Sequence, residues 1–120
     1  MNAIARYEEQ AITTQNRGRL VVLLYEGAIR FLRQALAASM AGEFRKQSHS
    51  IARAQDILLE LNTVLDMEAG GTLAQNLRDL YTFLWQHLNR SNMNNHPQGI
   101  RRSIAILEEL VGGWKAIVAA

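Results

Sequence analysis

A chain of 120 residues, 48% of them hydrophobic, is long enough to bury one core and too short for two domains of ordinary size. The absence of cysteine from the sequence excludes disulfides, thiolate metal sites and a cysteine nucleophile. The 13 basic and 11 acidic residues give a net charge of +2 and are dispersed along the chain, so charge alone does not indicate nucleic-acid binding.

Two features of the sequence bear on where the protein is located. The residues near the N-terminus include Arg6 and Glu8 and form no apolar stretch, so we expect no cleaved secretory signal and a cytosolic location. The most apolar run is interrupted by Glu26, Arg30 and Arg33, and it falls short of the roughly 20 apolar residues that span a bilayer. We therefore expect no membrane insertion.

The first long helix is predicted over residues 20–40. Its apolar side chains recur every three or four positions on two overlapping stripes, and only a narrow stripe that includes Glu26 and Arg30 is polar. A helix that is apolar around most of its circumference must be covered on two sides, either by other helices of a bundle or by a partner.

Residues 43–65 and 73–88 predict the second and third long helices, each with one inward-facing apolar stripe. The inward stripe of the third helix consists of Leu73, Leu77, Leu80, Leu84 and Leu88. Beside that stripe, Tyr81 and Trp85 form an aromatic pair four positions apart. Both residue types suit half-buried or interface positions, because each combines an apolar ring with a polar group.

Pro97 follows an asparagine-rich loop and suits the first turn of a last helix, whose apolar stripes extend from Ile100 to Val118. Gly112 and Gly113 lie inside this helix, and each costs about 1 kcal/mol relative to alanine. The pair indicates either a fraying helix end or a close approach of the backbone to a neighbour, and we expect fraying.

The resulting fold class is all-α. Four long helices joined by short loops predict an antiparallel up-and-down four-helix bundle, with an extra short N-terminal helix or segment. We expect a single domain in which residues 1–15 form a mobile N-terminal segment and residues 18–119 form the bundle.

Residues 65–72, between the second and third predicted helices, contain two carboxylates and a double glycine. Gly70 or Gly71 can adopt the left-handed conformation that ends a helix, and Thr72 with Gln75 matches the capping box that begins the next. The carboxylates would accept backbone N–H groups in the turn, braced by the neighbouring asparagine. The residues of this predicted structural corner are Asp66, Glu68, Gly70, Gly71, Thr72 and Asn76.

Catalytic and metal-binding interpretations of the sequence are weaker. A carboxylate pair can bind a metal ion or act as acid and base, but two carboxylates with no histidine nearby are too few for a dedicated cation site. His49, His87 and His96 lack the spacing of metal ligands, and no glycine pattern of a phosphate-binding loop occurs. We therefore expect no catalytic residues, no metal and no cofactor. The arginine pairs are isolated and are typical of a solvated face, so we also expect no nucleic-acid partner.

Three stretches together resemble the FliS family, the flagellin-specific export chaperones. These stretches are LVVLLYEGAIRFLRQAL, IARAQDILLELNTVLDMEAGGTLAQNLRDLY and ILEELVGGW. The resemblance spans essentially the whole chain and rests on four ordered features. They are the L-Y-[DE]-G-A-I stretch (Leu24 to Ile29), the L-D-x-E-x-G-G corner (Leu65 to Gly71), the N-L-x-x-L-Y stretch (Asn76 to Tyr81) and Trp114.

The resemblance implies a helical bundle that binds the disordered C-terminal segment of flagellin in the cytosol. Such a chaperone holds flagellin unpolymerised until the flagellar type III export apparatus takes it. The flagellin segment would become helical in pieces against hydrophobic grooves of the bundle, which is coupled folding and binding. The groove residues that we expect, because they lie beside the main core stripes, are Tyr25, Ile29, Leu77, Tyr81 and Trp85.

The resemblance also gives the N-terminal segment a function, since Ile4 and Tyr7 match the family's I-x-x-Y motif. This segment would cover the binding surface when no client is present and would dock to the export gate. The alternative from the residues alone is that it packs a short helix on the bundle. The family often has T-x-S-P before the first long helix, whereas residues 14–17 are TQNR, so we expect a looser start.

Two other functions remain open at this point. The apolar stripes could drive self-association of a purely structural bundle, and a homodimer could form when no client is present. Alternatively, the protein could be an adaptor for an export substrate other than flagellin.

Overall fold

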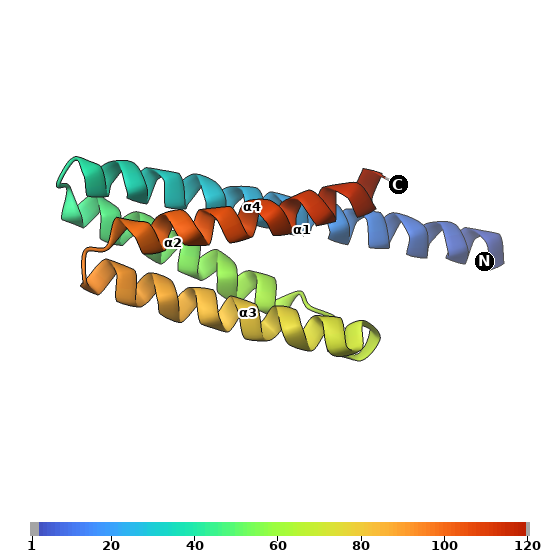
Figure 1. The fold of residues 1–120 in the computed structure, drawn as a ribbon. Coiled ribbons are helices and arrows are strands. Elements are labelled where there is room, and N and C mark those ends of the chain that lie inside the picture. Colours follow the sequence, from blue (N-terminus) through green and yellow to red (C-terminus); the bar gives the residue numbers. More distant parts are fainter. Residues whose placement is uncertain (1–2, 120) are drawn as a thin grey trace.

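The computed structural model describes the backbone of residues 3–119 and the side chains of residues 17–118, and this part of the chain contains four helices. They are α1 (Ala3–Met40), α2 (Phe44–Thr63), α3 (Met67–Met93) and α4 (Pro97–Ala119). No strand occurs within residues 3–119. The prediction of an all-α four-helix bundle is confirmed (Figure 1).

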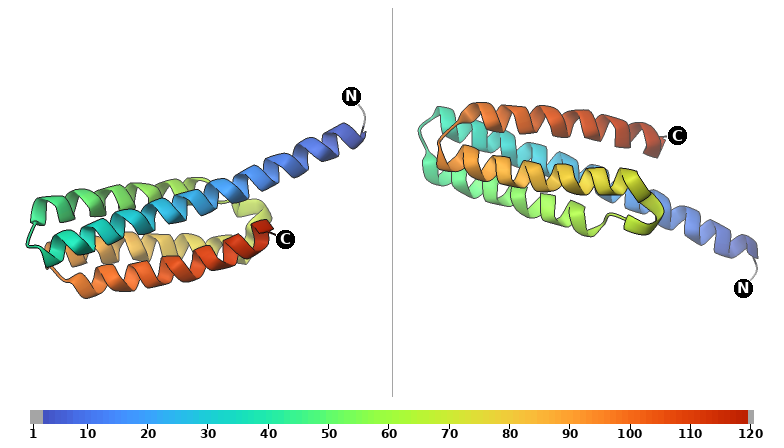
Figure 2. Two further views of the ribbon diagram at one scale, coloured as in Figure 1. Left: turned by 90° about the horizontal axis from the view of Figure 1, so that it is seen from above. Right: turned by 60° about the horizontal axis from the view of Figure 1, so that its bottom comes forward.

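The helices run alternately up and down around one core. α1 packs against both α2 and α4, and α3 completes the bundle by packing against the same two helices. The α1–α2 and α3–α4 turns lie together at one end, which we call the turn end (Figures 1 and 2). The α2–α3 turn and the end of α4 lie at the other, which we call the terminal end.

α1 runs without a break from Ala3 to Met40, and its first turns extend beyond the other helices (Figure 2). The N-terminal element expected before the bundle is therefore continuous with the first bundle helix, and the looser start expected at residues 14–17 lies inside α1. The side chains of Ile4 and Tyr7 lie outside the described part. The division into a mobile segment and a bundle that begins at residue 18 stays a prediction.

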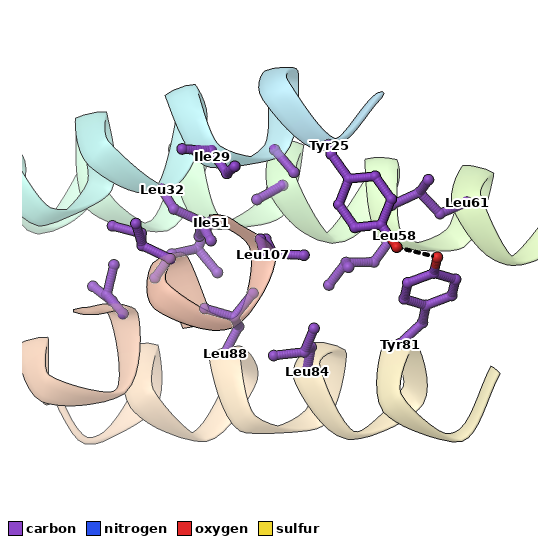
Figure 3. Close-up of a cluster of buried hydrophobic side chains, with 14 of the residues drawn as sticks. Tyr25, Ile29, Leu32, Ile51, Leu58, Leu61, Tyr81, Leu84, Leu88 and Leu107 are labelled. Atoms are coloured by element: carbon purple, nitrogen blue, oxygen red, sulfur yellow. Dashed lines mark hydrogen bonds between the residues drawn. The ribbon is translucent and has the colours of Figure 1, made fainter. Parts of the chain in front are cut away.

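Each helix contributes one buried stripe to the core, as its apolar spacing predicts (Figure 3). The members of these stripes include Tyr25, Ala28, Leu32, Ile51, Ala54, Leu58, Leu61, Leu77, Tyr81, Leu84, Leu88, Ile100, Leu107 and Val111. Fully burying one such leucine or isoleucine contributes about 1.5–3 kcal/mol, so these stripes are the main source of stability. Leu73, predicted to point inward, is instead exposed, because it lies in the first turn after the kink at Gly71.

The corner between α2 and α3 contains a single turn of helix and then a kink. Asp66 begins this turn, and its side chain accepts a hydrogen bond from the backbone N–H of Ala69 at 3.0 Å. Gly71 has φ of 52°, a left-handed value at which a side chain would be strained. The kink redirects the chain into the long part of α3. Gly70 is helical, and a Cβ added there would lie 2.6 Å from Ala74 Cβ.

The capping box expected at this corner does not form. Within residues 17–118, no side-chain hydrogen bond joins Thr72 and Gln75, and Gln75 Nε2 donates instead to Asp79 Oδ1 at 3.0 Å, one turn further along α3. The side chains of Glu68 and Asn76 make no hydrogen bond with any residue of the described range 17–118. The predicted bracing by the asparagine is therefore also absent from this part of the chain.

α4 begins at Pro97, as predicted, and runs through its two internal glycines to Ala119. The expected fraying at Gly112 and Gly113 is therefore wrong. The close-approach alternative is wrong as well, because a Cβ added to either glycine would meet no atom within 4 Å. Val111 is buried and Trp114 packs against the core on either side of the pair, and these contacts keep the helix intact.

Polar side chains connect α2 to α3 near the turn end. Gln47 is buried and donates from Nε2 to Asn92 Oδ1 at 3.0 Å. Ser48 and Asn92 also bond to each other at 3.2 Å. Because buried amide groups are costly when unpaired, this small network fixes how α2 and α3 align.

A candidate partner-binding surface on the helical bundle

Four of the five residues expected in a surface groove are core residues. Tyr25, Ile29, Leu77 and Tyr81 are buried, and Trp85 is half-buried. Positions beside the main apolar spacing still point inward here, because each helix packs against two neighbours and its buried stripe is wide. The expected placement in a groove is thus corrected for Tyr25 and Leu77. Ile29 and Tyr81 are buried yet each lines a hollow of the bundle, and the part of all four residues in binding stays a prediction.

Tyr25 and Tyr81 connect α1 to α3 across the core. Their hydroxyl groups hydrogen-bond to each other, and the ring centroids lie 6.2 Å apart with the ring planes tilted by 60° (Figure 3). Burial raises the pKa of both phenols, although the side chains of Tyr81 and Trp114 partly oppose the rise for Tyr25. Both phenols are therefore neutral at physiological pH.

A cavity of about 320 Å³ lies beside Tyr81 at the terminal end, and we call it the end cavity. All four helices contribute to its wall. The apolar residues and glycine that line it are Gly18, Val21, Leu61, Val64, Leu65, Tyr81, Trp114, Ile117 and Val118. Arg17 and Asp66 supply its charged groups. An apolar cavity of this size matches the smaller ligand-binding sites of proteins and can accept apolar side chains of a partner.

Gly18 controls how closely the end of α4 approaches α1. A Cβ at this position would lie 2.9 Å from Val118 Cγ2, which is closer than nonbonded carbon atoms normally come. The absence of a side chain at Gly18 thus lets α4 close one side of the end cavity.

A second hollow adjoins the end cavity around α1. It shares Val21, Val64 and Leu65 with the cavity and adds Leu20, which is exposed. The apolar surface therefore continues from the end cavity across α1 toward the corner between α2 and α3.

Apolar side chains also line the seam between α3 and α4. A Cβ on Gly99 would contact Ser91 and His87. Gly99 therefore marks the side of α4 that faces α3, and Ser91 and His87 mark the side of α3 that faces α4. By helical periodicity, three apolar residues of α3 and three of α4 share those facing sides. We call this set the α3–α4 strip, and it consists of Leu73, Leu80, Phe83, Ile106, Leu110 and Ile117.

Half of the α3–α4 strip is open to solvent. Leu73, Phe83 and Ile117 are 64%, 43% and 68% exposed, while the other three members are half-buried and pack against the core. Ile117 also lines the end cavity, so the strip and the cavity form one continuous apolar surface. A contiguous exposed apolar surface of this kind is typical of a binding site for another protein.

Trp85 lies on a different side of α3 from this surface. Gln55 Nε2 donates to the carbonyl oxygen of Trp85 at 3.1 Å, so this part of α3 faces α2. Sequence reasoning selected Trp85 and missed Leu73 and Phe83. The second apolar stripe of α4, which includes Ile106, Leu110 and Ile117, was the signal that could have indicated this surface. Apolar residues on α3 that lie opposite this stripe are candidates for the same surface.

Comparison with known proteins identifies the family. A family model described as "Flagellar protein FliS" matches residues 1–120. The chain belongs to the FliS family. One relative, "Flagellar secretion chaperone FliS" of Vibrio cholerae, is 34% identical over 82% of this chain and 73% of its own length. Another, "Flagellar secretion chaperone FliSB" of Pseudomonas aeruginosa, is 32% identical over 98% of this chain and 96% of its own length.

Membership of the FliS family makes this protein a flagellar export chaperone rather than an enzyme. Residues 17–118 contain no group of three or more histidine, aspartate or glutamate side chains placed to hold a metal ion. Across residues 3–119, no helix combines the length and the apolar character needed to cross a membrane.

The four sequence features that resemble the FliS family converge at the terminal end. The Leu24 to Ile29 stretch supplies Tyr25, and the Asn76 to Tyr81 stretch supplies its hydrogen-bonding partner. The corner supplies residues 65 and 66 to the end cavity, and Trp114 supplies part of its wall. Three of the four features therefore contribute to the wall of the end cavity, and the fourth contacts that wall through Tyr25.

Proposed function

We propose that this chaperone binds the disordered C-terminal segment of flagellin on the end cavity and the α3–α4 strip. The exposure of Leu73, Phe83 and Ile117 along one seam beside the end cavity supports the proposal most strongly, because clustered exposed apolar side chains are typical of protein-binding surfaces. A disordered segment that folds as an amphipathic helix can cover such a seam with side chains spaced three and four residues apart.

The proposed complex forms in the cytosol, and it prevents flagellin from polymerising before export. Covering the segment removes the apolar surface through which flagellin would assemble. The chaperone then delivers its client to the flagellar type III export apparatus. Coupled folding and binding loses several kcal/mol to ordering, so many apolar contacts are needed.

The N-terminal residues carry two further parts of the proposal. Gly18 and Val21 line the end cavity, so the N-terminal residues are joined to the bundle next to the proposed binding surface. Ile4 and Tyr7 would cover this surface when no client is present, and they would dock the loaded chaperone to the export gate.

Titration calorimetry with the C-terminal segment of flagellin from the same organism tests the proposal. We expect saturable one-to-one binding with a negative heat-capacity change, and circular dichroism should show added helicity in the mixture. Absence of binding by the folded chaperone would contradict the proposal and direct the search to another export substrate.

Two leucines of equal exposure make a matched pair of variants for this titration. Leu73, in the α3–α4 strip, is 64% exposed, and Leu23, on the outer side of α1, is 65% exposed. Leu73→Ser should weaken binding about tenfold or more, because it removes apolar area that the client buries. Leu23→Ser should leave binding unchanged. Equal effects of the two substitutions would contradict the assignment of the surface.

Gel filtration without the client tests the self-association alternative. A second copy could cover the same strip, in which case the apparent size should rise with protein concentration and Leu73→Ser should suppress the rise. A monomer at all concentrations would exclude that alternative.

A further inference from the structure

The turn between α3 and α4 contains a cavity of about 290 Å³ at the turn end, away from the end cavity but next to Phe83 of the α3–α4 strip, whose ring stacks on His87. We call it the basic cavity. Arg90 and His87 of α3 line it, together with Arg102 of α4 and His96 of the connecting turn. Neither aspartate nor glutamate is among its lining residues. The cavity is therefore surrounded by groups that attract negative charge.

The surrounding sequence does not neutralise this charge. No acidic residue occurs between positions 80 and 107, a segment that includes Arg90, Arg101 and Arg102. Three ion pairs occur among the side chains of residues 17–118, and none of them involves Arg90 or Arg102. Both guanidinium groups remain available to an anion, and a guanidinium can form two parallel hydrogen bonds with one oxyanion.

A buried nitrogen atom without a partner lies in the wall of the same cavity. His87 Nε2 is enclosed by protein and makes no hydrogen bond within the described part of the chain. It lies 3.2 Å from where a Cβ of Gly99 would be, a position that the Ser91 side chain fills. Buried polar atoms are normally paired, so this nitrogen would accept a partner from a ligand that enters between His87 and Gly99.

Two electrostatic features favour an anion in the basic cavity. α4 begins at Pro97, so the positive end of its helix dipole points toward the cavity region. Burial lowers the pKa of His87, and the positive charges of Arg90, Arg102 and His96 lower it further, while a polar contact with the Gly99 backbone partly opposes the decrease. An anion in the cavity would counteract those positive charges and raise the pKa of His87.

We propose that the basic cavity binds a phosphate group, held between Arg90 and Arg102 with a hydrogen bond to His87. Its volume lies at the lower limit for small-molecule sites, which suits inorganic phosphate or a small phosphate ester and no larger molecule. The arginines are on different helices, so a bound phosphate also ties the end of α3 to the start of α4.

Titration of the whole ¹⁵N-labelled chain with inorganic phosphate at constant ionic strength tests this site by NMR. The amide signals of His87, Ser91 and Gly99 should move and saturate together. Signals that move linearly with phosphate concentration, or that move mainly elsewhere, would overturn the proposal. The basic cavity adjoins the α3–α4 strip through the stacked rings of Phe83 and His87. The phosphate titration contains no client, so its failure would leave the calorimetric test of client binding unaffected.

Adjacent arginines supply the matched control. Arg102 lines the basic cavity, whereas Arg101 approaches Met40 Sδ of α1 at 3.8 Å and lies outside the cavity. Arg102→Gln should weaken phosphate binding about tenfold or more, because a charged hydrogen-bond donor is lost. Arg101→Gln should leave it nearly unchanged. Equal weakening by both substitutions would show a diffuse effect of net charge and overturn the site.

A parallel titration with glycerol phosphate distinguishes the source of the phosphate group. Equal or tighter binding of the ester would support the site and assign it to a small organic phosphate. Binding of inorganic phosphate alone would support the site and assign it to the free ion. Failure of both probes to bind at the folded chain's basic cavity would overturn the proposal.

Discussion

Polar side chains connect the helices at the turn end of the bundle, whereas apolar contacts around a cavity hold the terminal end. At the turn end, the buried amide of Gln47 is paired with Asn92, and the cavity there is basic. At the terminal end, Trp114 and Tyr81 line an apolar cavity, and Leu73 and Ile117 remain exposed. Exposure alone does not distinguish the two ends, because Met40, Phe44 and Met93 are exposed at the turn end. The difference teaches that buried polar pairs specify the alignment at one end, while at the other an apolar cavity can accept side chains of a partner.

Truncating a core leucine should produce the largest change in stability. Leu88 is fully buried, so Leu88→Ala should lower the free energy of unfolding by about 2–5 kcal/mol through lost burial and a new cavity. Leu73→Ala, at an exposed site of the same helix, should change it by no more than about 0.5 kcal/mol. Urea unfolding of both variants measures the contrast, and comparable losses would contradict the assignment of Leu73 to the surface.

Breaking the polar connection near the turn end should have the next largest effect. Asn92→Ala leaves the buried amide of Gln47 without its partner and should cost about 1–3 kcal/mol. Replacing both residues by apolar ones, Gln47→Met with Asn92→Leu, should recover most of that loss. A double-mutant cycle by urea unfolding tests this, and additive losses would show that the two residues act independently.

The tyrosine pair should make stability depend on pH under alkaline conditions. The pKa values of Tyr25 and Tyr81 are raised in the folded state, so folding favours the neutral phenols. Their contribution is fully present below the unfolded pKa of about 10 and is lost as pH rises above it. Unfolding should therefore become easier above that pH. The double variant Tyr25→Phe, Tyr81→Phe should lose much of this pH dependence. If the double variant kept the same dependence of stability on pH, the tyrosine pair would not be its cause.

Removing the cap at the corner should have the smallest of these effects. Asp66→Ala deletes the hydrogen bond to the Ala69 N–H and should cost about 1 kcal/mol. Asp66→Asn keeps an acceptor oxygen and should cost less. Thermal unfolding compares the two, and equal losses would show that the carboxylate charge matters more than the cap.

Helical periodicity was sufficient to predict the four helices and most of the core. It could not separate Tyr25 and Tyr81, which are buried, from groove residues, because both kinds of position lie beside an apolar stripe. It also placed Leu73 inside, since the kink at Gly71 that precedes this residue depends on backbone conformation. Fraying at Gly112 was expected from local propensity, and packing of the surrounding side chains overrides that propensity.

The candidate surface was harder to predict than the fold. Its members come from different helices, and their exposure depends on how far α3 and α4 are covered by their neighbours. The sequence shows that Phe83 and Ile117 are apolar, but only the assembled bundle shows that both remain exposed along one seam.

Mapping the client by NMR on the ¹⁵N-labelled chaperone tests the central claim most directly. On addition of the flagellin C-terminal segment, amide signals should change at residues 17–21, 64–66, 73–83 and 106–118. Residues 44–50 and 91–102, at the turn end, should change little. Changes concentrated at the turn end, with the terminal end unaffected, would contradict the assignment of client binding to the end cavity and the α3–α4 strip.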